Sequence, residues 1–163
     1  MLSDPLISEA ATLLDVCRRA GIRLATAESC TGGLIAATLT AVPGSSDVVE
    51  RGFVTYSNEA KTELLGVPAE LIAAHGAVSE PVARAMAEGA LIHARADVAV
   101  AVTGIAGPGG GTPNKPVGLV HIACARTNRT TLHERHVFAG DRSTIRMRAV
   151  EAAFALIRRQ SEE

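Results

Sequence analysis

The segment Val98-Ala-Val-Ala-Val102 is an uninterrupted run of small and β-branched apolar residues. A half-exposed strand alternates apolar and polar side chains, so a run without any polar position is typical of a strand that is covered on both faces. Such a strand requires helices packed on both sides of its sheet. This segment therefore favours an α/β fold and constrains the architecture more than any other stretch of the chain.

Capping residues and apolar periodicity predict the remaining elements. The expected helices are 3–21, 34 to about 41, 57 to about 66, 79–93 and 141 to about 159, and the expected strands are 23–27, 52–56, 98–102, 118–125 and 131–138. Only residues 126–130 separate the last two strands, which suits an antiparallel hairpin. This order predicts a three-layer α/β/α sandwich around a mixed, mainly parallel sheet of about five strands.

The size and charge of the chain limit its organisation and partners. Its 163 residues suffice for one core, so we expect residues 1–163 to form a single domain. A net charge of -1 and an aromatic content of 2% provide neither the basic surface nor the stacking platforms that nucleic acid requires. No stretch approaches the roughly 18 apolar residues of a membrane span, and no basic leader pattern opens the chain. We therefore expect a cytoplasmic protein without nucleic-acid or membrane partners.

Cysteine, histidine and glycine spacing disfavour metal ions and common cofactors. Cys17, Cys30 and Cys124 form no C-x-x-C pair, so we expect reduced thiols rather than disulfides or a zinc site. The histidines show no metal-ligand spacing. The loop 103–116 is rich in glycine and proline but matches neither a P-loop nor a dinucleotide-binding fingerprint. The sequence thus predicts no metal and no cofactor.

Three segments are expected to meet at the carboxyl edge of the sheet, where open α/β sheets bind ligands: 28–33, 56–61 and 103–108. Ser29 lies where the first strand turns into its helix, which suits a nucleophile. An oxyanion could be stabilised there by backbone N–H groups of Cys30, Thr31, Gly32 and Gly33. Alternatively, Ser29 or Thr31 caps the helix and the glycines only permit close packing.

A serine nucleophile needs a neighbouring base, and Lys61 is the best placed candidate. It lies about one turn into the helix after the second strand, with Tyr56 at the tip of that strand. No histidine is expected at the end of a parallel strand. Lys61 could equally be an ordinary solvated lysine, and Tyr56 could either relay a proton between Ser29 and Lys61 or be a half-buried strand residue.

Further candidate ligand contacts come from the glycine-rich loop and the last helix. Thr103, Gly104 and Gly107 could wrap a ligand through the backbone, or the loop could be a mobile connector. Arg142 and Arg146 lie on one face at the start of the last helix, where cations oppose the helix dipole. A bound phosphate would compensate for this charge, although solvated surface arginines are the alternative.

Taken together, these segments resemble a known family. The residues that carry the resemblance are Thr26-Ala-Glu-Ser-Cys-Thr-Gly-Gly33, Arg51-Gly-Phe-Val-Thr-Tyr-Ser-Asn-Glu-Ala-Lys61, Thr103-Gly-Ile-Ala-Gly-Pro108, Lys115-Pro-Val-Gly118 and Gly140-Asp-Arg142. They are similar to the CinA C-terminal domain family, the nicotinamide-nucleotide amidases, in matching order over about residues 5 to 160. One departure is Gly109, which stands where family members often carry Asp.

The resemblance implies hydrolysis of nicotinamide mononucleotide to nicotinic acid mononucleotide and ammonia. It also implies a serine nucleophile with lysine and tyrosine partners, which fall on Ser29, Lys61 and Tyr56. The chain resembles the stand-alone form of the family and could form a homo-oligomer. Three alternatives stay open: Cys30 as the nucleophile, a different amide or a phosphate ester as the substrate, and a non-catalytic nucleotide-binding or regulatory module.

Overall fold

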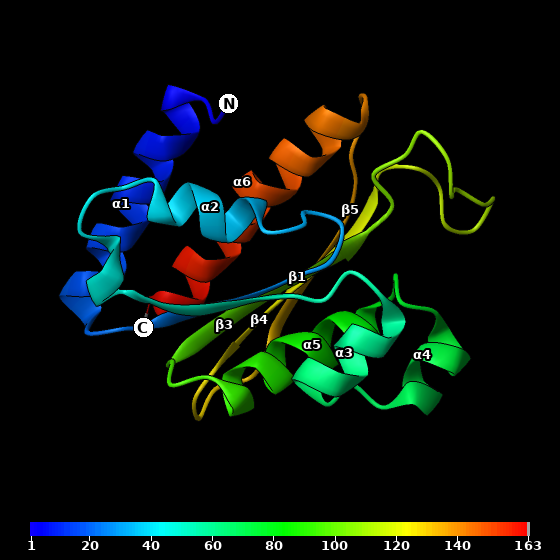
Figure 1. The fold of residues 1–163 in the computed structure, drawn as a ribbon, viewed down its shortest axis with the longest axis horizontal. Helices are drawn as coiled ribbons and strands as arrows, with labels where there is room; N and C mark the ends of the chain where they lie inside the picture. The colour runs from blue at the N-terminus through cyan, green and yellow to red at the C-terminus, as the bar shows by residue number, and fades with distance from the viewer. Residues whose placement is uncertain (163) are drawn as a thin grey trace.

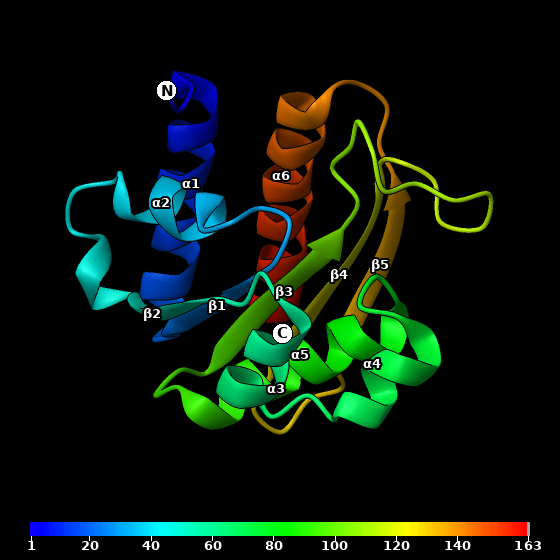
Figure 2. The same ribbon diagram turned by 45° about the vertical axis from the view of Figure 1, so that its right-hand side comes forward.

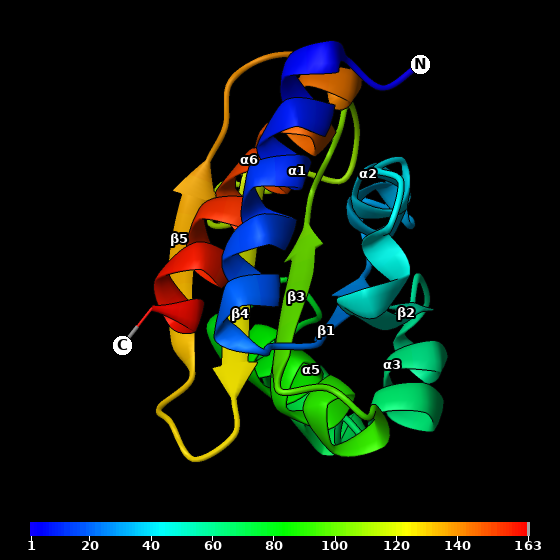
Figure 3. The same ribbon diagram turned by 90° about the vertical axis from the view of Figure 1, so that its left-hand side faces the viewer.

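The computed structural model describes residues 1–162 and consists of a five-stranded sheet between two layers of helices (Figure 1). The strands are β1 (Leu24–Glu28), β2 (Val49–Val54), β3 (Val98–Gly104), β4 (Leu119–Arg126) and β5 (Leu132–Val137). The helices are α1 (Asp4–Ala20), α2 (Leu34–Thr40), α3 (Asn58–Leu65), α4 (Ala69–His75), α5 (Glu80–His93) and α6 (Arg142–Ser161), with the 3-10 turn η1 (Ser45–Asp47). Helices α1, α2 and α6 cover one face of the sheet and α3, α4 and α5 the other (Figures 1 and 3). The predicted three-layer fold is confirmed.

The strand order β2-β1-β3-β4-β5 creates a crevice at the edge of the sheet. Strand β1 pairs in parallel with both β2 and β3, while β4 is antiparallel to its neighbours β3 and β5. After β1 the chain turns into α2 on one face, whereas after the adjacent β2 it turns into α3 on the opposite face (Figure 2). Because neighbouring loops part in this way, they leave room at the carboxyl ends of the parallel strands, the edge where open α/β sheets bind ligands.

Helix ends follow the capping chemistry expected from the sequence. The Ser3 hydroxyl accepts the Leu6 N–H at the start of α1, and Ser57 accepts the Ala60 N–H at the start of α3 at 3.0 Å. The Asp141 carboxylate does the same for α6. These caps satisfy backbone donors that have no partner within the helix. They determine where α3 and α6 begin and therefore where Lys61 and Arg142 lie.

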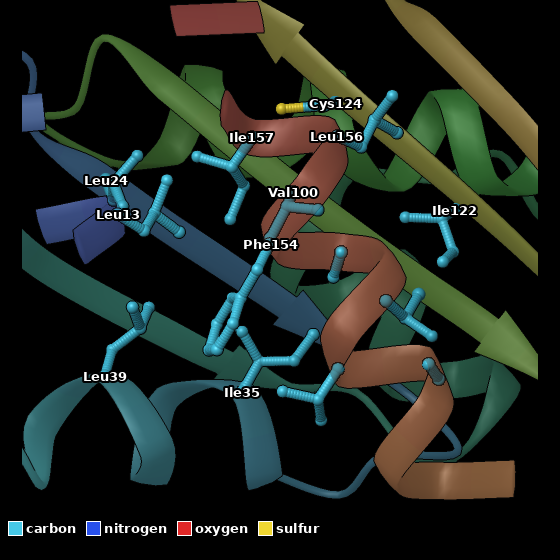
Figure 4. Packing of buried hydrophobic residues seen from close by; sticks show 14 of the residues in the cluster. Leu13, Leu24, Ile35, Leu39, Val100, Ile122, Cys124, Phe154, Leu156 and Ile157 are labelled. Atoms are coloured by element: carbon cyan, nitrogen blue, oxygen red, sulfur yellow. The ribbon is translucent and has the colours of Figure 1, made fainter. Parts of the chain in front are cut away.

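The two faces of β3 contact cores of different side-chain size. Val98, Val100 and Val102 pack on the side of α1, α2 and α6, where Phe154 and several leucines and isoleucines interlock (Figure 4). Ala99 and Ala101 face α5, where small side chains let the helix approach closely. Within this layer, α5 passes so close to the end of α3 that a Cβ added to Gly89 would overlap the Leu65 carbonyl oxygen. This contact fixes α3, the helix that carries Lys61.

Two strands and one helix depart clearly from the sequence prediction. Strand β2 spans Val49–Val54 rather than 52–56, because it is an edge strand that pairs only with β1 and its exposed positions obscure the pattern. Helix α4 was not predicted, since its seven residues are too few to establish a helical period. Strand β3 continues through Gly104, two residues into the expected loop, because antiparallel pairing with β4 extends there.

None of the helices in the described part of the chain combines the length and apolar character that a membrane span requires. The three cysteines are free and buried.

Candidate active site

The Ser29 hydroxyl and the Lys61 amine are in direct contact at the carboxyl edge of the sheet. The distance between Ser29 Oγ and Lys61 Nζ is 3.0 Å. Ser29 follows the last residue of β1, and Lys61 lies in the second turn of α3, which follows β2. The two residues are 32 positions apart in the chain. The structure therefore brings together the predicted nucleophile and base.

The Ser29 turn is held by backbone contacts on both sides. The Ser29 N–H donates to the Val102 carbonyl of β3 at 3.0 Å, which extends the parallel pairing by one residue. Gly32 and Gly33 adopt φ values of 57° and 103°, so the tight connection into α2 depends on glycine. Neither Ser29 nor Thr31 caps α2, since its capping bonds come from the Glu28 carboxylate. The purely structural alternative for Ser29 as a helix cap is therefore excluded.

Lys61 is a buried amine rather than a solvated surface lysine. Only 1% of the surface of Lys61 is exposed to solvent. Its Nζ lies 2.9 Å from the Thr55 carbonyl oxygen and 3.4 Å from those of Tyr56 and Ser57. Burial lowers the pKa of Lys61, because the ammonium form loses hydration, while Cys30 and Glu59 oppose this shift. The fraction of Lys61 that is neutral at a given pH is accordingly raised, as a general base requires.

Ser29 and Lys61 open into a cavity of about 300 Å³. Eight of the predicted site residues line it: Ser29, Cys30, Tyr56, Lys61, Thr103, Gly104, Gly107 and Arg142. The other lining residues are Asn58, Ala77, Val78, Ile105, Ala106, Gly109 and Gly110. The glycine-rich loop forms one wall, and Gly109, the departure from the family pattern, is part of it. A cavity bounded by a nucleophile, a base and exposed backbone can hold a small polar ligand.

Tyr56 lies at the rim of the cavity rather than between Ser29 and Lys61. It is 60% exposed, and its hydroxyl accepts a hydrogen bond from Arg142 Nη2 at 3.1 Å. The amine and the serine hydroxyl contact each other directly, so proton transfer between them needs no tyrosine relay. Arg142 also donates to the Gly107 carbonyl at 2.8 Å, which joins α6, the glycine-rich loop and Tyr56 around one opening.

Four predicted binding residues lie outside the cavity lining: Thr31, Gly32, Gly33 and Arg146. The Arg146 guanidinium donates to the carbonyls of Cys30 and Thr31 at 3.2 and 3.0 Å. Its donors therefore hold the Ser29 turn against α6 instead of an anion in the cavity. Of the two predicted arginines, only Arg142 reaches the opening.

Cys30 lines the cavity, but its thiol is protonated at neutral pH and is therefore a poor nucleophile. Burial raises the pKa of its thiol to about 11, and the nearby Glu28 carboxylate acts in the same direction. At neutral pH such a thiol is ionised in only about one molecule in 10⁴. This favours Ser29 over Cys30.

Asn58 is a cavity residue that the sequence reasoning missed, although its place in the turn before Lys61 could have indicated it.

A larger hollow of about 450 Å³ lies between α3 and α4 and is lined by neither Ser29 nor Lys61. Among residues 1–162, no three His, Cys, Asp or Glu side chains gather as metal ligands. The smaller cavity is therefore the candidate active site.

Comparison with known proteins finds relatives of this chain over most of its length. The model of the CinA C-terminal domain matches residues 7–161. A CinA-like protein of Mycolicibacterium gilvum is 57% identical over 160 residues, covering 96% of this chain and 38% of the relative. One from Syntrophobacter fumaroxidans is 55% identical over 140 residues, covering 86% of this chain and 33% of the relative. The chain thus spans between a third and two fifths of the length of these curated relatives.

Solved structures match over nearly the whole chain. The competence/damage inducible protein CihA of Agrobacterium tumefaciens superposes with a TM-score of 0.93 at 47% identity, covering 96% of both chains. A CinA superfamily protein of Escherichia coli gives a TM-score of 0.89 at 36% identity, covering 96% of this chain and 92% of the other. On the family model, the relatives and the fold, this chain belongs to the CinA family and carries its C-terminal domain.

Proposed function

We propose that this chain is an amidohydrolase that converts nicotinamide mononucleotide to nicotinic acid mononucleotide and ammonia, with Ser29 as nucleophile and Lys61 as base. The observation that carries the proposal is the 3.0 Å contact between Ser29 Oγ and the buried Lys61 amine. A serine hydroxyl becomes reactive when a neutral base receives its proton. An amine whose pKa is lowered by burial supplies that base without a histidine.

Acylation begins when Ser29 Oγ attacks the carboxamide carbon and its proton moves to Lys61 Nζ. The carbonyls of Thr55, Tyr56 and Ser57 surround the resulting ammonium and stabilise its charge. The tetrahedral intermediate then collapses as its C–N bond breaks. The Lys61 ammonium returns the proton to the departing nitrogen, which leaves as ammonia.

Deacylation repeats these steps with water in place of serine. Lys61 accepts a proton from water as its oxygen attacks the ester carbon, and the C–Oγ bond then breaks. Ser29 Oγ regains the proton from Lys61, and the carboxylic acid product releases its own proton to solvent and leaves as a carboxylate. The amine is neutral again at the end of the cycle and can serve as the base for the next substrate.

A backbone amide of the Ser29 turn would stabilise the oxyanion. The Ser29 and Gly32 N–H groups are already engaged, donating to the carbonyls of Val102 and Ser29. Of the other amides in the turn, only that of Cys30, directly after the nucleophile, belongs to a residue that lines the cavity, and it is the donor we assign. This N–H shares its peptide unit with the Ser29 carbonyl, which accepts the Gly32 N–H at 3.0 Å, so the orientation of the unit is fixed.

The rim of the cavity supports a phosphate-bearing substrate. Arg142 uses two of its guanidinium N–H groups on Gly107 and Tyr56, and its other N–H groups make no hydrogen bond within the described part of the chain, so an anion can bind them. Gly109 and Gly110 line the same wall and let the backbone approach a ligand closely. A nucleoside monophosphate would place its base near Ser29 and its phosphate at this rim.

The substrate assignment is tested by comparing ammonia release from nicotinamide mononucleotide, its riboside and free nicotinamide. We expect the mononucleotide to have the highest kcat/KM, and we expect Arg142→Met to remove its advantage over the riboside. Equal rates on all three compounds would refute the nucleotide assignment. Binding of the mononucleotide without any ammonia release would instead identify a non-catalytic nucleotide-binding module.

A further inference from the structure

Glu28 is a fully buried carboxylate that the proposed reaction does not use. It is the last residue of β1 and immediately precedes Ser29. Its Oε1 accepts the Ile35 N–H at 2.8 Å, and its Oε2 accepts the Ala36 N–H at 3.1 Å. Burying a charge is costly unless it is fully hydrogen-bonded. The two bonds show where this charge is satisfied.

Glu28 and Ser29 point to opposite faces of the sheet. Glu28 reaches α2, in the layer of α1 and α6, whereas Ser29 contacts Lys61 of α3, in the layer of α5. Successive residues of an extended chain alternate in this way, so the rotation of the strand end sets the direction of both side chains. A carboxylate tied at both oxygens to a helix therefore also restrains the hydroxyl on the other face.

The first turn of α2 could have been capped locally at lower cost. Its N-cap is Gly33, which has no side chain, and the Thr31 hydroxyl is buried and has no hydrogen-bond partner within residues 1–162. Ser, Thr, Asp or Asn at the N-cap is the common solution. Here the capping oxygens come instead from Glu28, the residue immediately before the nucleophile Ser29.

We propose that Glu28 is a positioning residue that holds Ser29 Oγ in reach of Lys61 Nζ. The inference rests on the proposed role of Ser29. If the carboxylate loses a partner amide, the end of β1 can rotate and the 3.0 Å contact between the hydroxyl and the amine is lost. This change slows the covalent step and leaves the substrate contacts at Arg142 and the glycine-rich loop in place.

The reactivity of Ser29 can be measured without the substrate by using phenylmethanesulfonyl fluoride. In this reaction an O–S bond forms at Ser29, the S–F bond breaks, fluoride leaves, and the hydroxyl proton passes to Lys61. Peptide mass spectrometry identifies the labelled residue. We expect Glu28→Gln, which keeps the shape but replaces one acceptor oxygen by an NH2 group, to be labelled on the order of 10- to 100-fold more slowly.

Gln160→Leu is the matched control. Gln160 is also buried, and its side chain donates to the carbonyls of Cys124 and Thr130 at 2.7 and 3.0 Å, away from the cavity. We expect this variant to lose thermal stability at least as much as Glu28→Gln and to be labelled within about twofold of the wild-type rate. A slow Gln160→Leu protein would show that general destabilisation explains the effect, which overturns the assignment.

A second pair of measurements separates positioning from the proposed function. With nicotinamide mononucleotide, we expect Glu28→Gln to lower kcat and leave KM within about twofold, and Glu28→Asp, which keeps the charge but withdraws the oxygens, to do the same. If Glu28→Gln does not fold, Glu28→Asp decides. A folded variant labelled at the wild-type rate overturns the inference, whereas a labelled wild-type Ser29 without ammonia release refutes only the proposed function.

Discussion

Replacing Lys61 by Met tests the buried amine directly. Methionine is similarly long and unbranched, so it fills the same space while removing the group that contacts Ser29 Oγ at 3.0 Å. Loss of a general base typically costs about 10²- to 10⁴-fold in rate. We therefore expect kcat for amide hydrolysis to fall by about that factor, with a smaller change in KM.

The same substitution changes how stability depends on pH. Burial lowers the pKa of Lys61 from its usual 10.5 in the folded protein. Between the folded and unfolded pKa values, the unfolded chain binds a proton that the folded protein has lost, so wild-type stability rises with pH in this interval. Below the folded pKa the destabilising effect of the buried ammonium is present in full. The methionine side chain of the Lys61→Met variant binds no proton, so the stability of the variant lacks this dependence.

The hydrogen bonds of Lys61 contribute an offset that does not depend on this titration. Met leaves the Ser29 hydroxyl and the Thr55 carbonyl without their amine partner, at about 1–3 kcal/mol for each group that stays buried and unpaired. This offset sets the size of the stability difference near neutral pH. The change of that difference with pH reports only the shifted titration of Lys61.

The assay is urea unfolding of wild type, Lys61→Met and Lys115→Met at about pH 7 and about pH 10. Lys115→Met is a matched control, because Lys61 and Lys115 are the only two lysines of the sequence and Lys115 donates to the His75 carbonyl away from Ser29. We expect the free energy of unfolding of the wild type, relative to that of Lys61→Met, to increase as the pH rises. A difference that stays constant or shrinks would refute a lowered pKa for Lys61.

Three further predictions follow from the site and its supports. The rate of amide hydrolysis should rise with pH and level off above the pKa of Lys61, because only the neutral amine accepts the Ser29 proton. Burial lowers this pKa below 10.5, so a kcat/KM profile whose midpoint lies at or above pH 10.5 would contradict the assignment. Cys30→Ala should keep most of the activity, because burial raises the Cys30 pKa to about 11, and loss of ammonia release comparable to that of Ser29→Ala would favour a thiol nucleophile. Gly89→Ala should lower the free energy of unfolding by about 1–3 kcal/mol or more through overlap with the Leu65 carbonyl, and unchanged stability in urea unfolding would show that α3 and α5 pack less closely.

Most of the fold was predictable because its signals are local. The apolar run 98–102 implied two covered faces, and caps such as Ser57 and Asp141 gave helix starts that the structure confirms. The limits of β2 were not predictable, since the pairing that defines an edge strand comes from β1 and leaves little pattern in its own residues. Helix α4 was not predicted because its seven residues are too few to show a helical repeat of apolar side chains.

The chemistry of the site was predictable in kind but not in detail. The strand-to-helix turns placed Ser29 and Lys61 at the same edge of the sheet, and the structure puts them in contact. The hydrogen bonds from Arg146 to two backbone carbonyls were not predictable, because they depend on how α6 packs against the Ser29 turn. The role of Glu28 was equally hidden, since an acidic residue at a strand end ordinarily indicates solvent exposure.

The central claim is that the Ser29 hydroxyl attacks the amide. The most direct test is ammonia release from nicotinamide mononucleotide by Ser29→Ala, with Cys30→Ala as the neighbouring control. We expect Ser29→Ala to lose on the order of 10³-fold or more in kcat while it still binds the nucleotide, and Cys30→Ala to stay active. Ammonia release by Ser29→Ala at the wild-type rate would contradict the account.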